Sequence, residues 1–347
     1  MRKFILLLFL AAFLAVYGQK PGHQSFRVVS YNVENYFDCV DDSLTADEEF
    51  LPGAIRGWNY KRYADKQHAI ARVLVAIGEW NPPDLVGLCE VESRQALTDL
   101  VQYSSLRALN YQFIHYESPD PRGIDVALLY QAHSFRPISH KAISAGMPGV
   151  DGYQTRDLLY VSGILPTADT LHVIVCHFPS RSGGESATEA RRLHAASILR
   201  MQVDSILSTN KKAKIILMGD FNDNPDNASL KDVLQAHNPV GDYRFDQLYN
   251  LAWPLYKQGA GTLKYQGVWS TFDQIIVSGG LLLSGSNSFH CRQEHFRVFD
   301  AGFLLEDDLQ YLGKKPFRTY HGMKYQGGFS DHLSVVLECW YPTSQGR

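Results

Sequence analysis

The sequence lacks an excess of basic residues. Its 347 residues contain 33 Lys and Arg against 36 Asp and Glu, which gives a formal net charge of -3. Without residues 1–18, which include Arg2 and Lys3, 31 basic residues stand against 36 acidic ones and the charge is -5. Tight nonspecific binding to nucleic acid draws on many phosphate contacts from Lys and Arg. We therefore expect any polyanionic partner to be held locally and transiently.

The sequence also lacks a cluster of Cys and His at the spacing of a zinc site. Three of its five cysteines lie within apolar runs and are expected to be buried free thiols: Cys89, Cys176 and Cys339. Cys39 and Cys291 lie in loop-like sequence, where a disulfide between them is the alternative to two free thiols. Any bound metal is therefore expected to prefer oxygen ligands.

No apolar run is long enough to cross a bilayer comfortably, which disfavours a transmembrane anchor. The chain begins with Arg2 and Lys3, an apolar run from Phe4 to about Val16, and small residues before Gln19. This order is typical of a secretory signal peptide, and no cysteine follows it to carry a lipid. We expect residues 1–18 to be removed and the protein to be secreted or periplasmic, without a stable membrane anchor.

No internal repeat or low-complexity linker divides the chain. Short runs rich in Val, Ile and Leu recur, and several lack polar alternation, which is typical of strands covered on both faces. The predicted strands cover residues 26–31, 84–91, 124–130, 158–165, 171–178, 214–221, 272–277 and 333–340. Apolar residues at helical spacing predict helices over 61–80 and 185–207. The alternation predicts an α/β fold in which two packed sheets are flanked by helices, formed by residues 19–347 as one monomeric domain.

Polar side chains close almost every predicted strand. Asp220 and Asn222 follow a buried strand in the run GDFNDNP, which by itself is typical of a tight turn. Similar groups recur at the other strand ends: Asn32, Glu90, Glu92, Asp125, His177, Ser180, Arg181, Asp273, Asp331 and His332. A turn explanation must account for each group separately, whereas one shared polar site accounts for all of them.

In order along the chain, these motifs resemble those of the endonuclease/exonuclease/phosphatase superfamily, also called DNase I-like. The resemblance rests on SYNVEN, LCEVE, CHFPS, GDFN, TFDQI and SDH, and it spans residues 26–340. It implies an exported, bacterial-type member with the four-layer α/β/β/α fold. It also implies hydrolysis of phosphoester bonds with Mg²⁺ or Mn²⁺.

The resemblance implies a metal site. Glu90 is expected to be the main ligand, aided by the amide oxygen of Asn32 and by Asp331. Hard divalent ions prefer such oxygen ligands. A metal ion here would neutralise charge on the phosphoryl oxygens as the transition state forms.

The resemblance also implies two pairs of histidine and carboxylate, His332 with Asp273 and His177 with Asp125. A carboxylate fixes the tautomer and orientation of an imidazole and favours its charged form. Such histidines exchange protons near neutral pH or bind a phosphoryl oxygen as cations.

Three further residues complete the expected site. Asp220 and Asn222 would hold the attacking water and the scissile phosphate in line, and either Asp220 or His332 could take the proton of the water. Arg156 is expected to contact a phosphate through its forked guanidinium. A surface salt bridge is the alternative for Arg156.

The sequence is compatible with three functions. The first is an exported metal-dependent phosphodiesterase, foremost a nuclease, with aromatic residues that could stack on bases: Trp58, Tyr60, Trp269, Tyr320 and Tyr325. The second is a sphingomyelinase, phospholipase or small-molecule phosphatase of the same superfamily, although the sequence shows no clear apolar hairpin for a membrane. The third is a noncatalytic binding protein, which the retained set of polar groups disfavours.

Overall fold

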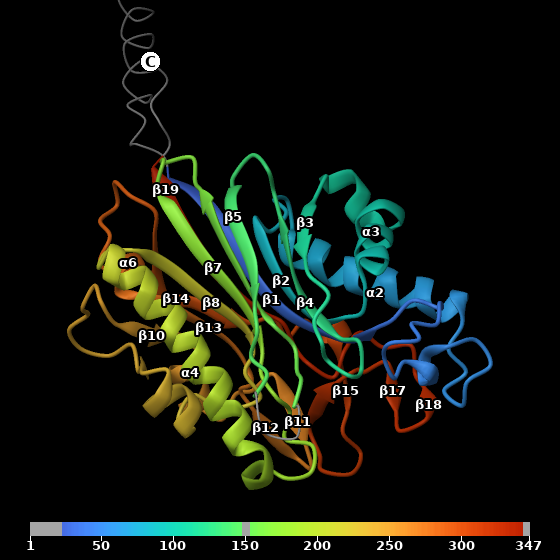
Figure 1. Ribbon diagram of the computed structural model, residues 1–347. Coiled ribbons are helices and arrows are strands. Elements are labelled where there is room, and N and C mark those ends of the chain that lie inside the picture. The colour runs from blue at the N-terminus through green and yellow to red at the C-terminus, as the bar shows by residue number, and fades with distance from the viewer. Residues whose placement is uncertain (1–22, 148–152, 343–347) are drawn as a thin grey trace, which may run out of the picture.

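The computed structural model describes residues 23–147 and 153–342. The predicted signal peptide at 1–18 lies outside the described residues. Two mixed sheets pack face to face with helices on both outer faces (Figure 1), so the predicted α/β/β/α sandwich is confirmed. In the described part of the chain, no helix is long and apolar enough to cross a membrane.

The first sheet has six strands. Four come from residues 23–130 and two from residues 290–342. In spatial order they are β14 (His290–Val298), β19 (Val335–Pro342), β1 (His23–Tyr36), β2 (Leu85–Val91), β4 (Asp125–Tyr130) and β3 (Gln112–His115). β1 runs parallel to β2 and antiparallel to β19. Helices α2 (Tyr60–Gly78) and α3 (Arg94–Tyr103) cover the outer face of this sheet (Figure 1).

The second sheet has seven strands, with α4 (Glu185–Thr209) along its outer face. In spatial order they are β5 (Arg136–Ile143), β6 (Leu158–Ile164), β7 (Thr170–His177), β8 (Lys214–Asp220), β13 (Asp273–Ser278), β10 (Leu248–Asn250) and β9 (Ala236–His237). β7 and β8 run parallel, and β13 runs antiparallel to β8.

Short elements fill the loops at one end of the sandwich and along its rim. The small hairpins are β11 (Leu263–Tyr265) with β12 (Val268–Ser270), β15 (Leu305–Asp307) with β16 (Lys314–Pro316), and β17 (Tyr320–His321) with β18 (Lys324–Tyr325). The short helices and turns are Glu48–Phe50, Ser105–Leu109, Ser229–Val233, α5 (Trp253–Lys257), α6 (Gly279–Leu282) and Gly302–Leu304.

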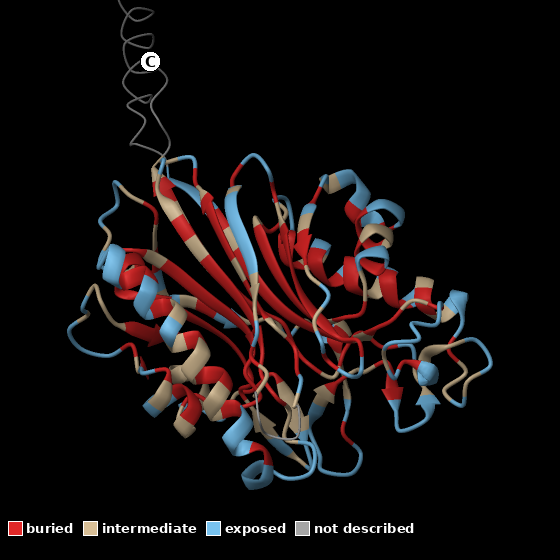
Figure 2. Cartoon of the chain, viewed as in Figure 1, coloured by how far each residue is buried: buried red, intermediate tan, exposed pale blue. Residues whose placement is uncertain are grey.

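Successive residues of the central strands enter different cores, because side chains alternate between the faces of a strand. Val28 lies between the two sheets, whereas Val29 packs under α2. Ile216 likewise lies between the sheets, whereas Ile215 packs under α4. The central strands are therefore buried on both faces, as the missing polar alternation predicted. Exposure concentrates in loops, in outer helix faces and in the edge strand β5 (Figure 2).

All five cysteines are free thiols and buried. The disulfide considered between Cys39 and Cys291 does not form, because the two residues belong to different cores: Cys39 packs under α2 and Cys291 lies between the sheets. Cys291 instead stands opposite Cys339 on the neighbouring strand. The prediction of buried thiols at Cys89, Cys176 and Cys339 is confirmed.

Candidate active site

The register of the sheets brings one end of each central strand to the same edge of the sandwich. His177 at the end of β7 stands opposite Asp220 at the end of β8, and Asp273 at the start of β13 stands on the other side of Asp220. In the first sheet, β1 and β2 run parallel. Asn32 in β1 lies beside the end of β2, which carries Glu90. The strand directions therefore gather residues that are far apart in sequence.

Left-handed backbone marks two of these strand ends. Glu90 has a φ of 65° and Asn222 a φ of 50°. For non-glycine residues this conformation costs about 1 to 3 kcal/mol and is concentrated at functional sites. Gly219 has a φ of 148°, and a Cβ on it would lie 1.8 Å from the carbonyl oxygen of Cys176. Only glycine therefore lets β8 approach β7 this closely next to Asp220.

His332 and Asp273 form a buried pair, so this predicted pairing is confirmed. His332 Nδ1 lies 2.7 Å from Asp273 Oδ2. The backbone N–H of His332 donates to Ser330 Oγ at 3.0 Å, and that hydroxyl donates to the carbonyl of Asn32 at 2.7 Å. Burial lowers the pKa of His332, but the carboxylates of Asp273 and Asp220 outweigh burial and hold this pKa well above its ordinary value. The two carboxylates therefore favour the charged form of His332.

His177 lies in the opposite electrostatic environment. Its Nε2 is 3.6 Å from Asp220 Oδ2 and 3.9 Å from Glu90 Oε1. Its buried Nδ1 has no hydrogen-bond partner among the described residues. Burial lowers the pKa of His177 well below its ordinary value, and the guanidinium groups of Arg156 and Arg122 lower it further. The surroundings thus shift the pKa values of the two histidines in opposite directions, although both imidazoles lie within 4 Å of Asp220.

The predicted pairing of His177 with Asp125 is wrong. Asp125 Oδ2 lies 3.0 Å from His115 Nε2, and Asp125 Oδ1 accepts from the backbone N–H of Ser118 at 2.9 Å. Asp125 opens β4 in the first sheet, between β3 and β2, whereas His177 closes β7 in the second sheet. The order of strands in the sheet decides the partner. His115 was missed because nothing local shows that its strand pairs with β4.

Asp220 is held on both carboxylate oxygens. Its Oδ1 accepts from the backbone N–H of Asn222 at 2.8 Å, and its Oδ2 accepts from Asn32 Nδ2 at 3.0 Å. Asn222 Nδ2 donates to the carbonyl of Phe178 at 3.0 Å. Burial raises the pKa of Asp220 to about 6, against the opposing effect of His332. The run GDFNDNP is therefore a tight turn that also delivers site residues.

Glu90 is oriented by two donors from β1. Its Oε2 accepts from the backbone N–H of Asn35 at 2.9 Å, and its Oε1 accepts from Asn32 Nδ2 at 3.3 Å. The amide oxygen of Asn32 accepts from the backbone N–H of Glu34 at 3.0 Å. Asn32 thus turns its amide nitrogen, not the predicted amide oxygen, toward Glu90 and Asp220. A role for Asn32 as a metal ligand stays a prediction, while its positioning of the two carboxylates is visible.

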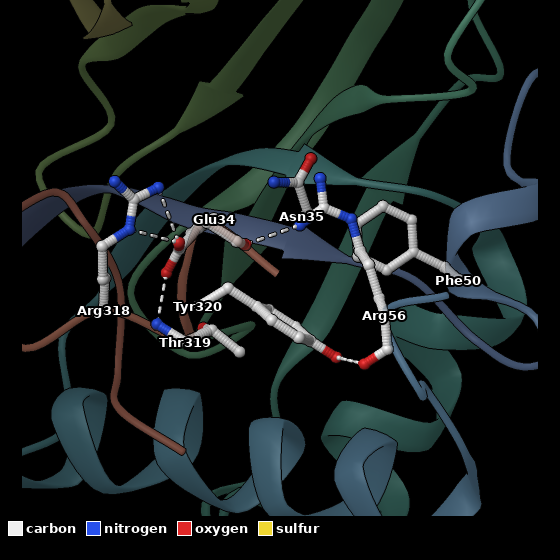
Figure 3. A pocket seen from close by; sticks show the side chains of 8 residues that line it. Glu34, Asn35, Phe50, Arg56, Arg318, Thr319 and Tyr320 are labelled. Atoms are coloured by element: carbon white, nitrogen blue, oxygen red, sulfur yellow. Dashed lines mark hydrogen bonds and ion pairs between the residues drawn. The ribbon is translucent and has the colours of Figure 1, made fainter. Parts of the chain in front are cut away.

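Asp331 adjoins a pocket that the sequence did not reveal. Its Oδ2 accepts from Arg318 Nη2 at 2.9 Å, and Arg318 Nε donates to Glu34 Oε1 at 3.1 Å. Arg318 and Glu34 line a pocket of about 290 Å³ together with Arg56 and Tyr320 (Figure 3). Asp331 is therefore ion-paired as well as a predicted metal ligand. Glu34 lies in the motif SYNVEN but was not singled out, and Arg318 had no sequence signal because it comes from a loop that follows no predicted strand.

Arg156 is buried rather than part of a surface salt bridge. Its Nη1 lies 3.1 Å from Asp120 Oδ2, and its Nη2 donates to the carbonyl of Phe178 at 2.9 Å. Only 4% of the residue is exposed. The phosphate contact stays a prediction, and Asp120 is the partner that sequence reasoning missed.

The predicted aromatic rim is only partly at the surface. Trp58 and Tyr320 are buried in the core under α2. Tyr60 is exposed, and Trp269 and Tyr325 are half-buried. Three of the five aromatic residues are thus left as candidates for stacking.

The oxygen donors around Glu90 fit a hard divalent ion. Glu90 and Asp331 keep 15% and 24% of their side chains exposed, so both carboxylates can be reached from solvent. The buried Oδ1 of Asp273 has no hydrogen-bond partner among the described residues, which leaves one oxygen acceptor free at this edge. Carboxylate oxygens are the ligands that Mg²⁺ and Mn²⁺ prefer. A separate group with ligand atoms within 4.8 Å of one another lies at the β3–β4 edge: His115, Glu117 and Asp125.

Several solved structures share this fold. The catalytic domain of human Nocturnin with bound sulfate has a TM-score of 0.54 and 17% identity, and the match covers 94% of this chain and 100% of that one. D. rerio TDP2 with a single-strand DNA product has a TM-score of 0.54 and 16% identity over 91% and 99% of the chains. A mannosyl-6-phosphatase of Bacteroides thetaiotaomicron has a TM-score of 0.55 and 15% identity over 90% and 99%. At these identities the similarity establishes the fold alone.

Sequence comparison establishes the family. No curated protein matches the chain. The model of the Endonuclease/Exonuclease/phosphatase family matches residues 27–340, which is nearly the span of the motifs. Members of this family hydrolyse phosphoester bonds and generally depend on a divalent metal ion. The chain therefore belongs to the endonuclease/exonuclease/phosphatase family and is a phosphoester hydrolase.

Proposed function

We propose that the chain is an exported, divalent-metal-dependent phosphodiesterase that cleaves by in-line attack of water, with nucleic acid as the foremost substrate class. The observation that carries the proposal is the contact of Asp220 with both His332 and His177 beside the His332–Asp273 pair. Phosphoryl transfer depends on positioning the reactants and on stabilising the charge that develops. This cluster supplies groups for both tasks.

The charges and positions of the residues in this cluster indicate a different role for each of them. His332, oriented by Asp273, donates to a phosphoryl oxygen and stabilises its negative charge. Asp220 lies 3.6 Å from His177 and 3.8 Å from His332, so it is the carboxylate best placed to take the proton of the attacking water. Asn222 fixes Asp220 through its backbone N–H.

Glu90 and Asp331 would hold the metal ion, with Asn32 orienting Glu90. The bound Mg²⁺ or Mn²⁺ supplies charge neutralisation at the phosphoryl oxygens. Asp273 stands opposite Asp220 on the neighbouring strand β13, and its contact with His332 holds that imidazole in place. The residues of the chain thus orient the phosphate and move one proton.

A lipid phosphodiesterase is the second candidate, because the structure contains the apolar hairpin that the sequence did not reveal. The tip between β15 and β16 exposes Leu309 at 91% and Leu312 at 79%. The neighbouring Tyr311 lines a pocket of about 230 Å³ that also includes Asp331 and Arg318. An exposed apolar tip beside a phosphoesterase site is a surface that a membrane could contact.

A substrate panel separates these candidates. The full chain, expressed with its leader and purified in its processed form, is assayed with Mg²⁺, Mn²⁺, Ca²⁺ or EDTA. The substrates are bis(p-nitrophenyl) phosphate, DNA and RNA oligonucleotides, sphingomyelin vesicles and a hexose monophosphate. We expect the diester and the oligonucleotides to be cleaved, His332→Ala to lower cleavage on the order of 100 to 10000-fold, and His133→Ala, at an exposed histidine, to retain it. Cleavage of sphingomyelin alone would favour the lipid enzyme, and cleavage of the monoester alone would overturn the phosphodiesterase proposal.

A further inference from the structure

A basic cavity of about 520 Å³ lies beside the catalytic cluster and is not used by the chemistry above. Three arginines line it, Arg122, Arg156 and Arg191, together with Asp120 and Ser180. Ser180 stands three residues after His177 in the run CHFPS. The cavity therefore opens next to the end of β7.

The cavity carries an uncompensated positive charge. Asp120 is its one acidic lining residue, and it lies 3.1 Å from Arg156 and 3.7 Å from Arg122. Arg191 lies over the ring of Tyr153, with its guanidinium carbon 4.2 Å from the ring centroid. No carboxylate within the described ranges forms an ion pair with Arg191. Three guanidinium groups thus share one carboxylate, which leaves a formal charge of about +2 that attracts anions.

One wall of the cavity is fixed to the catalytic cluster. Arg156 is buried and anchored by Asp120 and by the carbonyl of Phe178. The same carbonyl accepts from Asn222 Nδ2. The buried Nε of Arg156 has no partner among the described residues. A single carbonyl oxygen therefore joins the basic wall to the turn that holds Asp220.

The pocket lined by Glu34, Arg56 and Arg318 differs, because its arginines are already paired with carboxylates. There Arg318 pairs with Glu34 and Asp331, and Arg56 pairs with Glu49 (Figure 3 shows all but Asp331 and Glu49). Both arginines that line this pocket therefore already have a carboxylate partner. An additional anion is thus favoured on the side of Arg122 and Arg191.

We propose that the cavity lined by Arg122, Arg156 and Arg191 binds a second phosphate group of the substrate while the first is hydrolysed. The proposal rests on the proposed function and deepens it, because it selects substrates that carry at least two phosphates. Arginine suits this task, since its planar fork binds two phosphate oxygens at once. The neighbouring phosphate of a polynucleotide and a separate phosphomonoester offer the same chemistry, so the experiment must distinguish them.

The test compares substrates that differ only in the second phosphate. Thymidine dinucleotide, with one internal phosphate, is compared with dinucleotides that carry an added phosphate at one end or the other, and with a trinucleotide. A hexose monophosphate and a hexose bisphosphate form a parallel pair. We expect kcat/KM of the wild-type protein to rise about 10 to 100-fold with the second phosphate, the range for one or two charge-assisted contacts.

The variants Arg122→Gln, Arg191→Gln and the double variant should lower this ratio, and the double variant should bring it close to one. Both side chains are exposed enough to be replaced without opening the core. Arg136→Gln, at an exposed arginine on the far end of the second sheet, should keep the full ratio. Thermal melting of each variant checks that it is folded.

A wild-type ratio near one, or a ratio that survives the double variant, would overturn the proposal. An arginine-dependent gain for the trinucleotide over the dinucleotide identifies an internal phosphate of a polynucleotide. The same gain for a terminally phosphorylated dinucleotide or for the hexose bisphosphate identifies a phosphomonoester. If the wild-type protein hydrolyses neither dinucleotides nor bis(p-nitrophenyl) phosphate with any metal, the proposed function itself fails. The two failures are thereby distinguishable.

Discussion

At the scale of single residues, the neighbours of two buried imidazoles shift their pKa values in opposite directions. His332 is in contact with Asp273 and close to Asp220, and these carboxylates raise its pKa despite burial. Burial and the guanidinium of Arg156 lower the pKa of His177. The sequence, in which each histidine simply closes or precedes a strand, does not show this difference. We infer that the two residues contribute differently to catalysis.

The contribution of the His332–Asp273 pair can be measured with a double-mutant cycle. His332→Ala should lower kcat on the order of 100 to 10000-fold, the range for a positioned acid-base group. Asp273→Asn should cost less, because the imidazole stays present but loses its orientation. The double variant should resemble His332→Ala alone, since the two residues act as one unit. If instead the two losses multiply while thermal stability stays unchanged, the residues act independently.

The pairing of Asp125 with His115 could not be predicted from the local sequence around either residue. The pairing of His332 with Asp273 was predicted through the family resemblance, and the strand ends at Asn32, Glu90 and Asp220 through local pattern. The partner of Asp125 depends instead on which strands are neighbours in the sheet. No local pattern encodes that order, so His115 could not be identified.

At the scale of elements, the buried central strands were predictable and the edge strands were not. β7 and β8 are continuous apolar runs with both faces covered, and the pattern marks them clearly. β5 has no buried residue and β14 has only two, so neither strand shows a continuous apolar run and their sequences resemble loops. The helix prediction over 61–80 matches α2, whereas the short α3 was missed. A strand at the centre of a sheet is therefore easier to predict from sequence than a strand at its edge.

Strand β8 depends on glycine at its end. In Gly219→Ala the new Cβ would meet the carbonyl of Cys176 in a backbone conformation that alanine disfavours. We expect a loss of about 3 kcal/mol or more in the free energy of unfolding, measured by urea denaturation. Gly285→Ala is a matched control, because a Cβ there meets no atom within 4 Å. Equal midpoints for the two variants would show that the close approach of β7 and β8 is relaxed in solution.

Helix α2 is tied to the rim of the site by a buried lysine. Lys66 Nζ donates to Thr319 Oγ1 at 2.6 Å and to the carbonyl of Phe329 at 2.7 Å. Burial lowers the pKa of Lys66 to about 8, against the opposing carboxylates of Glu34 and Asp331. Between this value and the ordinary 10.5, the unfolded chain binds a proton that the folded protein does not, so raising the pH favours the folded state.

The stability difference between the wild-type protein and Lys66→Met should therefore shift with pH. From pH 8 to about 9.5, the wild-type protein should gain about 1 to 2 kcal/mol relative to the variant. Urea denaturation at each pH measures this gain. A difference that stays constant over that range would contradict the lowered pKa of Lys66.

At the scale of the whole molecule, the described residues form an α/β/β/α sandwich, and the proposed active site lies at an edge where both sheets meet. The export prediction concerns residues that lie outside the described part of the chain. If residues 1–18 are a signal peptide, the mature protein should begin at or close to Gln19 and should be found outside the cytoplasm. N-terminal sequencing of the protein from fractionated cells tests this expectation, and Met1 on mature cytoplasmic protein would end it.

The central claim is that the edge around Glu90 and Asp220 is a metal-dependent phosphodiesterase site. Its most direct test is the rate of bis(p-nitrophenyl) phosphate hydrolysis as Mg²⁺ or Mn²⁺ is titrated into EDTA-treated protein. We predict no activity without metal and saturable recovery with it. Glu90→Gln should need at least about tenfold more metal at a lower maximal rate, while Glu294→Gln, at an exposed carboxylate of β14, should titrate like the wild-type protein. Hydrolysis that persists in EDTA, or identical titrations for Glu90→Gln and the wild-type protein, would contradict the claim.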